Sequence, residues 1–582
     1  MIEYELVTNP ERLGHIANEL VQAPAVALDI ETTSLSPHHG QIRLVQLNTG
    51  KGIYVIDLFQ TGTLGPVCDA LSNEGVVKVI QNAKFEQKWF LHKFGLELWP
   101  LFDTFRASAM YHNGKNLGHN LYDLYRRELK ISPEVPDAGE SNWKGPLTEE
   151  QLRYAAEDVM HLLVLRDRLK EKLAKAGLLR AALIEFGAII GEASIELNGF
   201  RLDKTRWMRL VEQNREKHIE LRKKLDYELP HPKGMLSLPG ISAGFNYNSP
   251  VQVKAAFARL GIELEDTRED TFAMIAHKHP AIPTFMAYRK VSKKLSAFGE
   301  QFLEHIDKST GRVHTDFWPL TGAGRYSSSK PNLQQIPRGN DYRDCFWAGP
   351  GRKIVVVDFS QVELRITAEI SGDSLFRSIY LNGEDAHRRT ASIVSGVPIE
   401  EVTKQQRQAA KPVNFGLIYG LGAERLVIYS QSNYGVSITL GQAKKFIKRY
   451  FEGYAGVKAW HDRALRDFRR NPCVRTLSGR LRYLDPEKAH GEIFNTPVQG
   501  TGADGLKAAL RNTYYALKKY NGAAKMVHMV HDEIVTDTED DPELVAAVAE
   551  DVKGAMVNGI QPLIKSVPIL AEPDIGTSWA AH

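Results

Sequence analysis

Acidic residues stand at the ends of short apolar segments in the C-terminal half of the chain. Asp358 follows a run of four β-branched residues, IVVV, of the kind that forms a buried strand. Asp532 and Glu533 lie in MVHMVHDEIVT, whose apolar flanks predict two strands joined by an acidic turn. Taken alone, Asp358 is typical of a helix cap or turn. If Asp358 and Asp532 meet in the fold, their carboxylates can bridge two Mg²⁺ ions, which activate an attacking hydroxyl and stabilise a leaving phosphate.

A second group of acids lies near the N-terminus. Asp29 and Glu31 end the apolar segment AVALDIE, and residues two apart on a strand point to one face. Two such carboxylates repel each other unless a cation lies between them, and a metal ion is the natural candidate. Tyr154 and Asp158 are four apart on a predicted helix and share a face. Taken singly, Asp158 is typical of a solvated helix acid and Tyr154 of a packed aromatic.

In this order, and with NAKFE between them, these segments resemble the three motifs of the DEDDy-type 3′–5′ proofreading exonucleases. The resemblance implies that Asp29, Glu31, Glu86 and Asp158 hold two metal ions and that Tyr154 orients the attacking water. Glu86 departs from the family pattern, which has aspartate there. Its extra methylene moves the carboxylate oxygens by about 1.5 Å, and metal sites are sensitive to such displacements. We expect an active exonuclease, because the other ligands are intact.

Length and composition are compatible with a multidomain protein that binds nucleic acid. A chain of 582 residues predicts several domains. The net charge of +4 is mildly basic, which is weak evidence for nucleic acid by itself. Cys68, Cys345 and Cys473 lack metal-ligand spacing and indicate a reducing compartment. No signal-peptide pattern and no apolar run of membrane-spanning length is visible, so we expect no membrane partner.

DFSQVELR, which starts at Asp358, and VHDE, which contains Asp532, resemble motifs A and C of the family A DNA polymerases. The resemblance implies that Asp358 and Asp532 hold two Mg²⁺ ions, with Mn²⁺ as a substitute. Glu533 would support catalysis near the primer end, and His531 would contact DNA.

A helical stripe between these motifs resembles motif B. Arg407, Lys411, Phe415 and Tyr419 recur every four residues in KQQRQAAKPVNFGLIYG, and twelve residues of helix span about 18 Å. Such a stripe is weak evidence by itself, since aromatics at this spacing are more often core. The resemblance implies that the basic end binds the triphosphate and the aromatic end the base and sugar, with Lys411 a candidate proton donor to pyrophosphate. Pro412 predicts that the helix starts late or bends there.

Two further residues bear on the nucleotide by resemblance. Glu363 would lie beneath the sugar C2′ position and clash with a ribose hydroxyl, which favours dNTPs and argues against a phage-type single-subunit RNA polymerase. Taken alone, Glu363 is typical of an exposed helix acid. His387 is a weaker candidate for nucleotide contact.

Three further residues are candidate DNA contacts by resemblance. Arg325, in TGAGRYSSSKPNLQQIP, would test the minor-groove edge of the primer end, where acceptors are similarly placed on every base pair. Asn495 and Gln499, in FNTPVQG, would contact template and primer. Gly491 stands where family members often carry a basic residue, so one phosphate contact is missing or replaced.

The resemblance extends from Asp29 to His582 and implies a multidomain fold, α/β and α+β, with an RNase H-like exonuclease domain followed by a right-hand polymerase. Five segments are expected: exonuclease (1–185), connector and thumb (186–315), first palm part with motif A (316–373), fingers with motif B (374–490) and second palm part with motif C (491–582). No segment is left for a 5′ nuclease domain.

We therefore predict a template-dependent DNA polymerase with proofreading activity in replication or repair. Its partners are primer-template DNA and dNTPs, it acts as a monomer, and it works in a bacterial or phage-infected cytoplasm, with an organelle as the alternative. Two rival hypotheses are a nuclease whose second module only grips DNA and a non-catalytic replication scaffold. Neither a DNA-gripping module nor a scaffold needs Asp358 and Asp532 together with Arg407 and Lys411, so the presence of these residues argues against both rivals.

Overall fold

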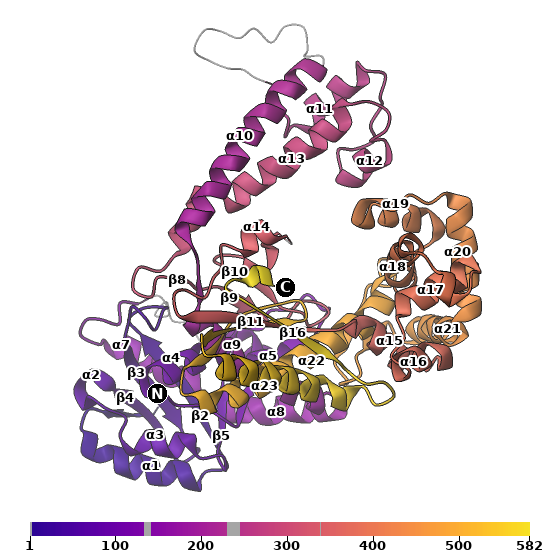
Figure 1. The fold of residues 1–582 in the computed structure, drawn as a ribbon. Coiled ribbons are helices and arrows are strands. Elements are labelled where there is room, and N and C mark those ends of the chain that lie inside the picture. The colour runs from indigo at the N-terminus through magenta and orange to yellow at the C-terminus, as the bar shows by residue number, and fades with distance from the viewer. Residues whose placement is uncertain (1–2, 133–140, 230–244, 338, 582) are drawn as a thin grey trace, which may run out of the picture.

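The computed structural model describes residues 3–132, 141–229, 245–337 and 339–581. An N-terminal domain built on a six-stranded sheet lies against a second body whose floor is a four-stranded sheet. A helical arm and a helical lobe rise from opposite sides of this floor (Figure 1). The two sheets carry the two groups of acids that the sequence singles out.

The N-terminal sheet is mixed, with strands in the order β1-β4-β3-β2-β5-β6. Its strand β2 (Ala25–Thr32) starts with four buried apolar residues and pairs antiparallel with β3 and parallel with β5. Two further strands of this sheet are β3 (Ile42–Asn48) and β4 (Ile53–Asp57). The other strands and the helices that matter below are β1 (Glu5–Val7), β5 (Val77–Ile80), β6 (Leu101–Asp103), α4 (Lys84–Phe94), α5 (Thr104–Tyr111), α7 (Glu149–Met160) and α8 (Leu162–Lys175).

Helix α9 (Leu179–Asn198) joins the N-terminal domain to the second body. It packs against α4 on one side and against α22 (Glu492–Leu517) on the other. A Cβ at Gly191 would lie 2.9 Å from the Cβ of Leu510, so only glycine allows α9 and α22 to approach this closely.

A buried ion network lies where these helices meet. Glu185 on α9 pairs with Arg480 at 2.6 Å and with Lys507 on α22 at 2.7 Å. Arg106 on α5 pairs with Glu192 on α9 at 2.5 Å. All five side chains are buried. Burial opposes ionisation of Glu185, but Lys507, Arg480 and Arg106 outweigh it and lower its pKa to about 2. The network therefore connects the two parts of the chain through charges that need one another.

The four-stranded sheet is antiparallel, in the order β14-β15-β11-β16. β11 (Arg352–Phe359) is the predicted β-branched strand, and β14 (Ala524–Val530) and β15 (Glu533–Glu539) form the predicted hairpin. Helices α22 and α23 (Pro542–Ile560) pack together, and α23 contacts β11. The fourth strand is β16 (Ala571–Gly576).

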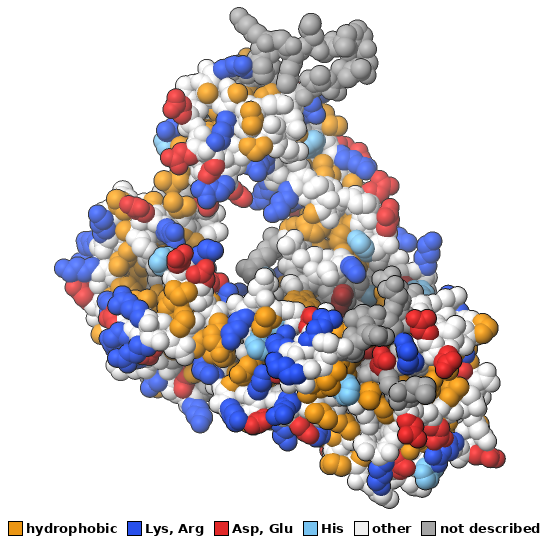
Figure 2. Space-filling view, turned by 180° about the vertical axis from the view of Figure 1, so that it is seen from behind, with side chains coloured by type: hydrophobic (Ala, Val, Ile, Leu, Met, Phe, Trp, Pro, Cys, Tyr) orange, Lys and Arg blue, Asp and Glu red, His pale blue; other side chains and the backbone are white. Residues whose placement is uncertain are grey.

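The arm and the lobe leave an opening between them. The arm consists mainly of the packed helices α10 (Lys204–Glu228) and α13 (Ala281–Phe298). Helix α12 (Glu269–Met274) of the arm contacts α19 (Ala423–Tyr434) of the lobe. Figure 2 shows an open passage enclosed by arm, lobe and floor. The remaining elements used below are α11 (Pro250–Ala258), α15 (Val362–Ser371), α16 (Ser374–Leu381), α17 (Ala386–Ser395), α18 (Lys404–Ile418), α20 (Leu440–Gly453), α21 (Ala455–Arg470), β12 (Cys473–Arg475) and β13 (Leu481–Tyr483).

Within the described ranges, no helix is both long enough and apolar enough to span a lipid bilayer.

The ion network generates a stability prediction. Glu185→Gln leaves Arg480 and Lys507 buried with one carboxylate fewer, which should lower the free energy of unfolding by about 3 kcal/mol. Thermal unfolding followed by circular dichroism measures the change. The matched control is Glu171→Gln on α8, whose partner Lys175 is exposed, and it should leave the midpoint unchanged. Equal midpoints for the two variants would contradict a stabilising role for the network.

Candidate active sites

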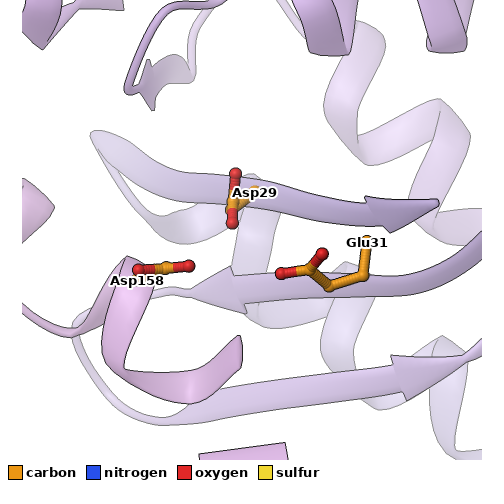
Figure 3. A group of neighbouring side chains, drawn as sticks. All are labelled: Asp29, Glu31 and Asp158. Carbon is orange, nitrogen blue, oxygen red and sulfur yellow. The ribbon is translucent and has the colours of Figure 1, made fainter. Parts of the chain in front are cut away.

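Three carboxylates converge on one point at the N-terminal sheet. Asp29 and Glu31 project from β2 and Asp158 from α7, and one oxygen of each lies within 4.8 Å of the others. Figure 3 shows the three side chains pointing toward one another. The structure therefore brings together three of the four carboxylates predicted as exonuclease ligands in a single group.

Helix α7 is set in place by its start and by its small buried residues. Thr148 and Gln151 form a capping box at its N-terminus. Ala155 and Ala156 are buried and let α7 approach the sheet, where it contacts β2, β3 and β4. The Tyr154 hydroxyl lies beside the Asp158 carboxylate and favours its charged form. Burial, followed by the charge of Asp158, raises the pKa of Tyr154, so its hydroxyl stays protonated.

Glu86 reaches the same site from α4. It is only 3% exposed, and its Oε2 has no hydrogen-bond donor among the described residues. The turn before α4 is held by Asp103, whose carboxylate accepts from the amides of Asn82 at 3.3 Å and Ala83 at 2.9 Å. Asp103 thus has a structural role, while Glu86 contacts Asp29.

At the first acidic site, formed by Asp29, Glu31, Glu86 and Asp158, the surroundings disfavour the charged form of the carboxylates. Burial raises the pKa of Asp29 to about 7. Burial, and then repulsion from Asp29 and other neighbouring carboxylates, raises the pKa of Glu31, Glu86 and Asp158. An all-oxygen donor set of this kind suits a hard divalent cation, and the orphaned Glu86 oxygen offers a further ligand.

The second acidic site is formed by strand pairing. β11 and β15 align Asp358 with Glu533, and the amide of Phe359 donates to the carbonyl of Asp532 at 3.3 Å. His531, in the turn, has φ 54, a left-handed conformation that turns the hairpin sharply. Burial and then the charge of Asp358 raise the pKa of Asp532 to about 7. The structure therefore places Asp358 next to Asp532, as predicted from the sequence. Their role in metal binding stays a prediction.

Glu533 is held by partners that the sequence did not reveal. The Trp579 indole nitrogen donates to its Oε1 at 2.6 Å, and Arg343 lies 3.4 Å from its Oε2. The Arg343 guanidinium also stacks 4.3 Å from the Trp579 ring centre. These contacts indicate that Glu533 anchors the hairpin to the C-terminal segment. Both partners lie far away in the chain, and no local pattern signals them.

Four predicted contact residues form a hydrogen-bonded cluster beside Asp532. Arg325 Nη2 donates to Glu363 Oε1 at 2.5 Å, and the Tyr419 hydroxyl donates to the other oxygen of Glu363. Gln499 on α22 interacts with the same hydroxyl. The charge of Glu363 also acts on Asp532. The carboxylate of Glu363 is therefore held in one orientation on α15.

Helix α18 carries the predicted basic and aromatic stripe. Arg407 Nε donates to Asp385 Oδ2 at 2.5 Å, and Asp385 also caps the start of α17. Lys411 is half-buried and has no ion pair with any described residue. Of the two outcomes expected at Pro412, the late start is wrong, because a capping box begins the helix at Lys404 and it runs on through Pro412.

His387 sits inside the lobe rather than on its surface. The Asn414 amide donates to its Nδ1 at 2.9 Å, and its ring centre lies 5.9 Å from that of Phe415. Burial lowers its pKa to about 4, so it is neutral at pH 7. The remaining predicted contacts, Asn495 on α22 and His531 in the hairpin turn, are half-buried and exposed, respectively.

Comparisons with known proteins cover nearly the whole chain. The family model of 3′–5′ exonucleases matches residues 4–174, and that of DNA polymerase family A matches residues 221–581. DNA polymerase I of Aquifex aeolicus is 33% identical over 99% of this chain and 100% of its own length. DNA polymerase I of Chloroflexus aurantiacus is 30% identical over 99% of this chain and 63% of its own length. The thermostable DNA polymerase I of Thermus aquaticus is 33% identical over 78% of this chain and 54% of its own length.

A solved structure has the same fold. It is the POL domain of Pol1 from M. smegmatis in complex with DNA primer-template and dNTP, with a TM-score of 0.82 and 24% sequence identity. The match covers 99% of this chain and 100% of that one.

The repulsion at the first acidic site generates a prediction on metal removal. In EDTA, Asp29→Asn/Asp158→Asn should unfold at a higher temperature than the wild type, because it removes repelling charges. In Mg²⁺ the wild type should regain its stability, by about 2.7 kcal/mol at a metal concentration one hundred times the dissociation constant. Asp167→Asn, an exposed acid on α8, is the control and should follow the wild type in both buffers. A double variant less stable than the wild type in EDTA would contradict the role of repulsion.

The same site predicts a pH dependence in EDTA. The folded-state pKa of Asp29, about 7, exceeds its ordinary value of 3.8. Between these values the folded state binds more protons than the unfolded state, so the free energy of unfolding falls as pH rises from about 4 to about 7. Thermal unfolding across this range in EDTA should show the decline in the wild type and a weaker one in Asp29→Asn/Asp158→Asn.

Proposed function

This chain belongs to DNA polymerase family A and is a DNA-directed DNA polymerase with a 3′–5′ exonuclease domain, and we propose that its two acidic sites divide synthesis and proofreading between them. The predicted order of an exonuclease domain followed by a polymerase domain is confirmed. The observation that carries the assignment of synthesis is the pairing of β11 with β15, which places Asp358 beside the Asp532 turn.

In synthesis, Asp358 and Asp532 would hold two Mg²⁺ ions, with Mn²⁺ as a substitute. When bound, such ions lower the pKa of an attacking hydroxyl and neutralise charge on the phosphates. Arg407 and Lys411 bind the triphosphate, and Phe415 and Tyr419 lie toward the base and sugar. Because Asp385 already neutralises Arg407, the incoming phosphates must displace this carboxylate. Lys411, which has no such partner in the described residues, is the proton donor to the leaving pyrophosphate.

Selection of the sugar falls to Glu363. Its carboxylate is held by Arg325 and Tyr419, so it cannot swing aside without breaking two hydrogen bonds. A ribose hydroxyl above it would meet a fixed, charged group. When a primer end binds, Arg325 turns from Glu363 to the minor-groove acceptors of the terminal base pair, and the Tyr419 hydroxyl continues to hold the Glu363 carboxylate beneath the sugar.

In proofreading, Asp29, Glu31, Glu86 and Asp158 would hold the metal ions, and Tyr154 would position the attacking water. Glu86 is seated on a turn whose amides are bound by Asp103, and it reaches Asp29 despite its longer side chain. This contact supports an active site in which glutamate replaces the usual aspartate.

The partners follow from these assignments. Primer-template DNA lies in the passage between arm and lobe, with Asn495, Gln499 and His531 as contacts at the floor. The similar solved structure is a complex with DNA primer-template and dNTP, which supports these ligands. We propose a monomer divided at the boundaries predicted from the sequence, with Glu533 as a support of the motif C hairpin. The bacterial relatives favour action in a bacterial or phage-infected cytoplasm.

The polymerase assignment is tested by Asp532→Asn. Loss of one ligand charge should reduce primer extension by at least about 100-fold, since metal ions supply several kcal/mol of charge stabilisation. Extension of a recessed 3′ end with Mg²⁺ and dNTPs is followed on a gel, and DNA affinity by fluorescence anisotropy. Affinity should be unchanged, as it should be in the surface control Asp540→Asn. Loss of DNA binding in Asp532→Asn would contradict the assigned role.

The exonuclease assignment is tested on the same primer without dNTPs. The wild type should shorten it, and Glu86→Ala should shorten it at least about tenfold more slowly while extending it normally with dNTPs. Glu86→Asp restores the usual family residue and should retain shortening. A wild type that extends the primer but never shortens it would show that glutamate is not tolerated here.

A further inference from the structure

Two neighbouring helices of the lobe concentrate the positive charge of the chain. Helices α20 and α21 together contain nine lysine and arginine residues and three acids, a net charge of +6. The whole chain carries +4, so the rest of it is slightly negative. Figure 2 shows lysine and arginine side chains spread over the lobe, which is at the left in that view.

The arginines of α21 form a stripe opposite its buried face. Val457, Trp460 and Phe468 point into the core. On a helix with 3.6 residues per turn, Arg463, Arg466 and Arg470 lie on the opposite side, and all three are exposed. None of these arginines has an ion pair within the described part of the chain.

A purely structural explanation accounts for only part of this stripe. Arg470 lies in the last turn of α21, where a cation is favoured by the helix dipole. Arg463 and Arg466 lie further inside the helix. Asp467 and Asp462 stand four residues from them, but neither acid forms an ion pair with these arginines among the described residues, and α21 keeps a net charge of +3. Surfaces without a charged partner usually intersperse both signs. An anionic partner would offset this net charge.

The stripe lies on the outer side of elements that carry the polymerase site. Helix α21 packs against α15, which carries Glu363, and against α22, which carries Asn495 and Gln499. Beyond α21, the chain continues into the β12–β13 hairpin, where Arg475 is also exposed. In the proposed function the incoming nucleotide binds α18 of the lobe, so the template base that pairs with it, and the uncopied template beyond that base, lie next to the lobe.

We propose that the exposed face of α21, centred on Arg463 and Arg466, binds the phosphate backbone of DNA ahead of the primer end. This inference rests on the proposed function and extends it to a second DNA contact. Arginine pairs well with phosphate through its planar fork of donors. From Arg463 to Arg470 the helix rises about 10 Å, and a duplex carries one charge per roughly 1.7 Å of its axis. Several phosphates therefore fall within reach, and the contact is independent of sequence.

The test compares two primer-templates. One ends one nucleotide beyond the primer, and the other continues into a duplex of twenty base pairs. The variant is Arg463→Gln/Arg466→Gln, and the matched control is Arg168→Gln/Lys170→Gln on α8, which also removes two exposed charges. Affinities are measured by fluorescence anisotropy at several salt concentrations, with Ca²⁺ in place of Mg²⁺ to prevent turnover.

On the long substrate, the variant should bind at least tenfold more weakly than the wild type, and the slope of log affinity against log salt should fall by about 1.8, as expected for two lost phosphate contacts. On the short substrate, the variant should bind and extend as the wild type does, and the control should match the wild type on both. Unchanged binding of the long substrate would overturn the proposal and leave the face to another anionic partner. Equal weakening on both substrates would also overturn it.

Failure of the proposed function gives a different result, because a wild type that extends neither primer-template contradicts polymerase activity itself. The binding comparison still decides whether this face contacts DNA.

Discussion

Both acidic sites, that of Asp29 and that of Asp358 with Asp532, place carboxylates close together, and the fold must withstand their mutual repulsion. At about 4 Å and an effective dielectric constant of about 20, two like charges repel by about 4 kcal/mol. Paired strands resist this force because they cannot shift without breaking ladder hydrogen bonds. β2 lies inside a six-stranded sheet, and β11 lies between β15 and β16. Burial raises the pKa of Asp29, and burial followed by repulsion from Asp358 raises that of Asp532, so a bound cation would favour the charged form of both carboxylates.

The same rigidity extends from one site to the other. Lys507 on α22 pairs with Glu185 on α9, and Glu185 with Arg106 on α5. Arg106 also lies 3.5 Å from Asp103, whose carboxylate holds the turn before α4 and hence the start of the helix that carries Glu86. Each buried charge in this series has partners from other elements, so a displacement of one element would leave a buried charge without its partner. The exonuclease and polymerase sites are thus held in one frame.

Charged groups around the polymerase site are provided with internal partners. Glu363 holds Arg325, and Asp385 holds Arg407. These pairs keep the cations oriented in the absence of DNA and nucleotide, and a ligand must offer well-placed hydrogen-bond acceptors to replace them. This exchange favours correctly placed DNA and nucleotide, because a poorly placed ligand does not make up for the free energy of the ion pair that it breaks. The arginines of α21 differ, since no described residue occupies that place.

What the sequence by itself determined is local: the β-branched strand before Asp358, the hairpin around Asp532, the paired acids of β2 and the order of the motifs that indicates the family. These features depend on neighbouring residues, whose side-chain period and backbone preference can be recognised from the chain. Only the tertiary structure decided which further groups meet at these sites. Glu533 is held by Trp579 and Arg343, 46 and 190 residues away in the sequence. His387 is neutral because Asn414 and the lobe interior enclose it. Such contacts arise from packing between distant segments, and no local pattern encodes them.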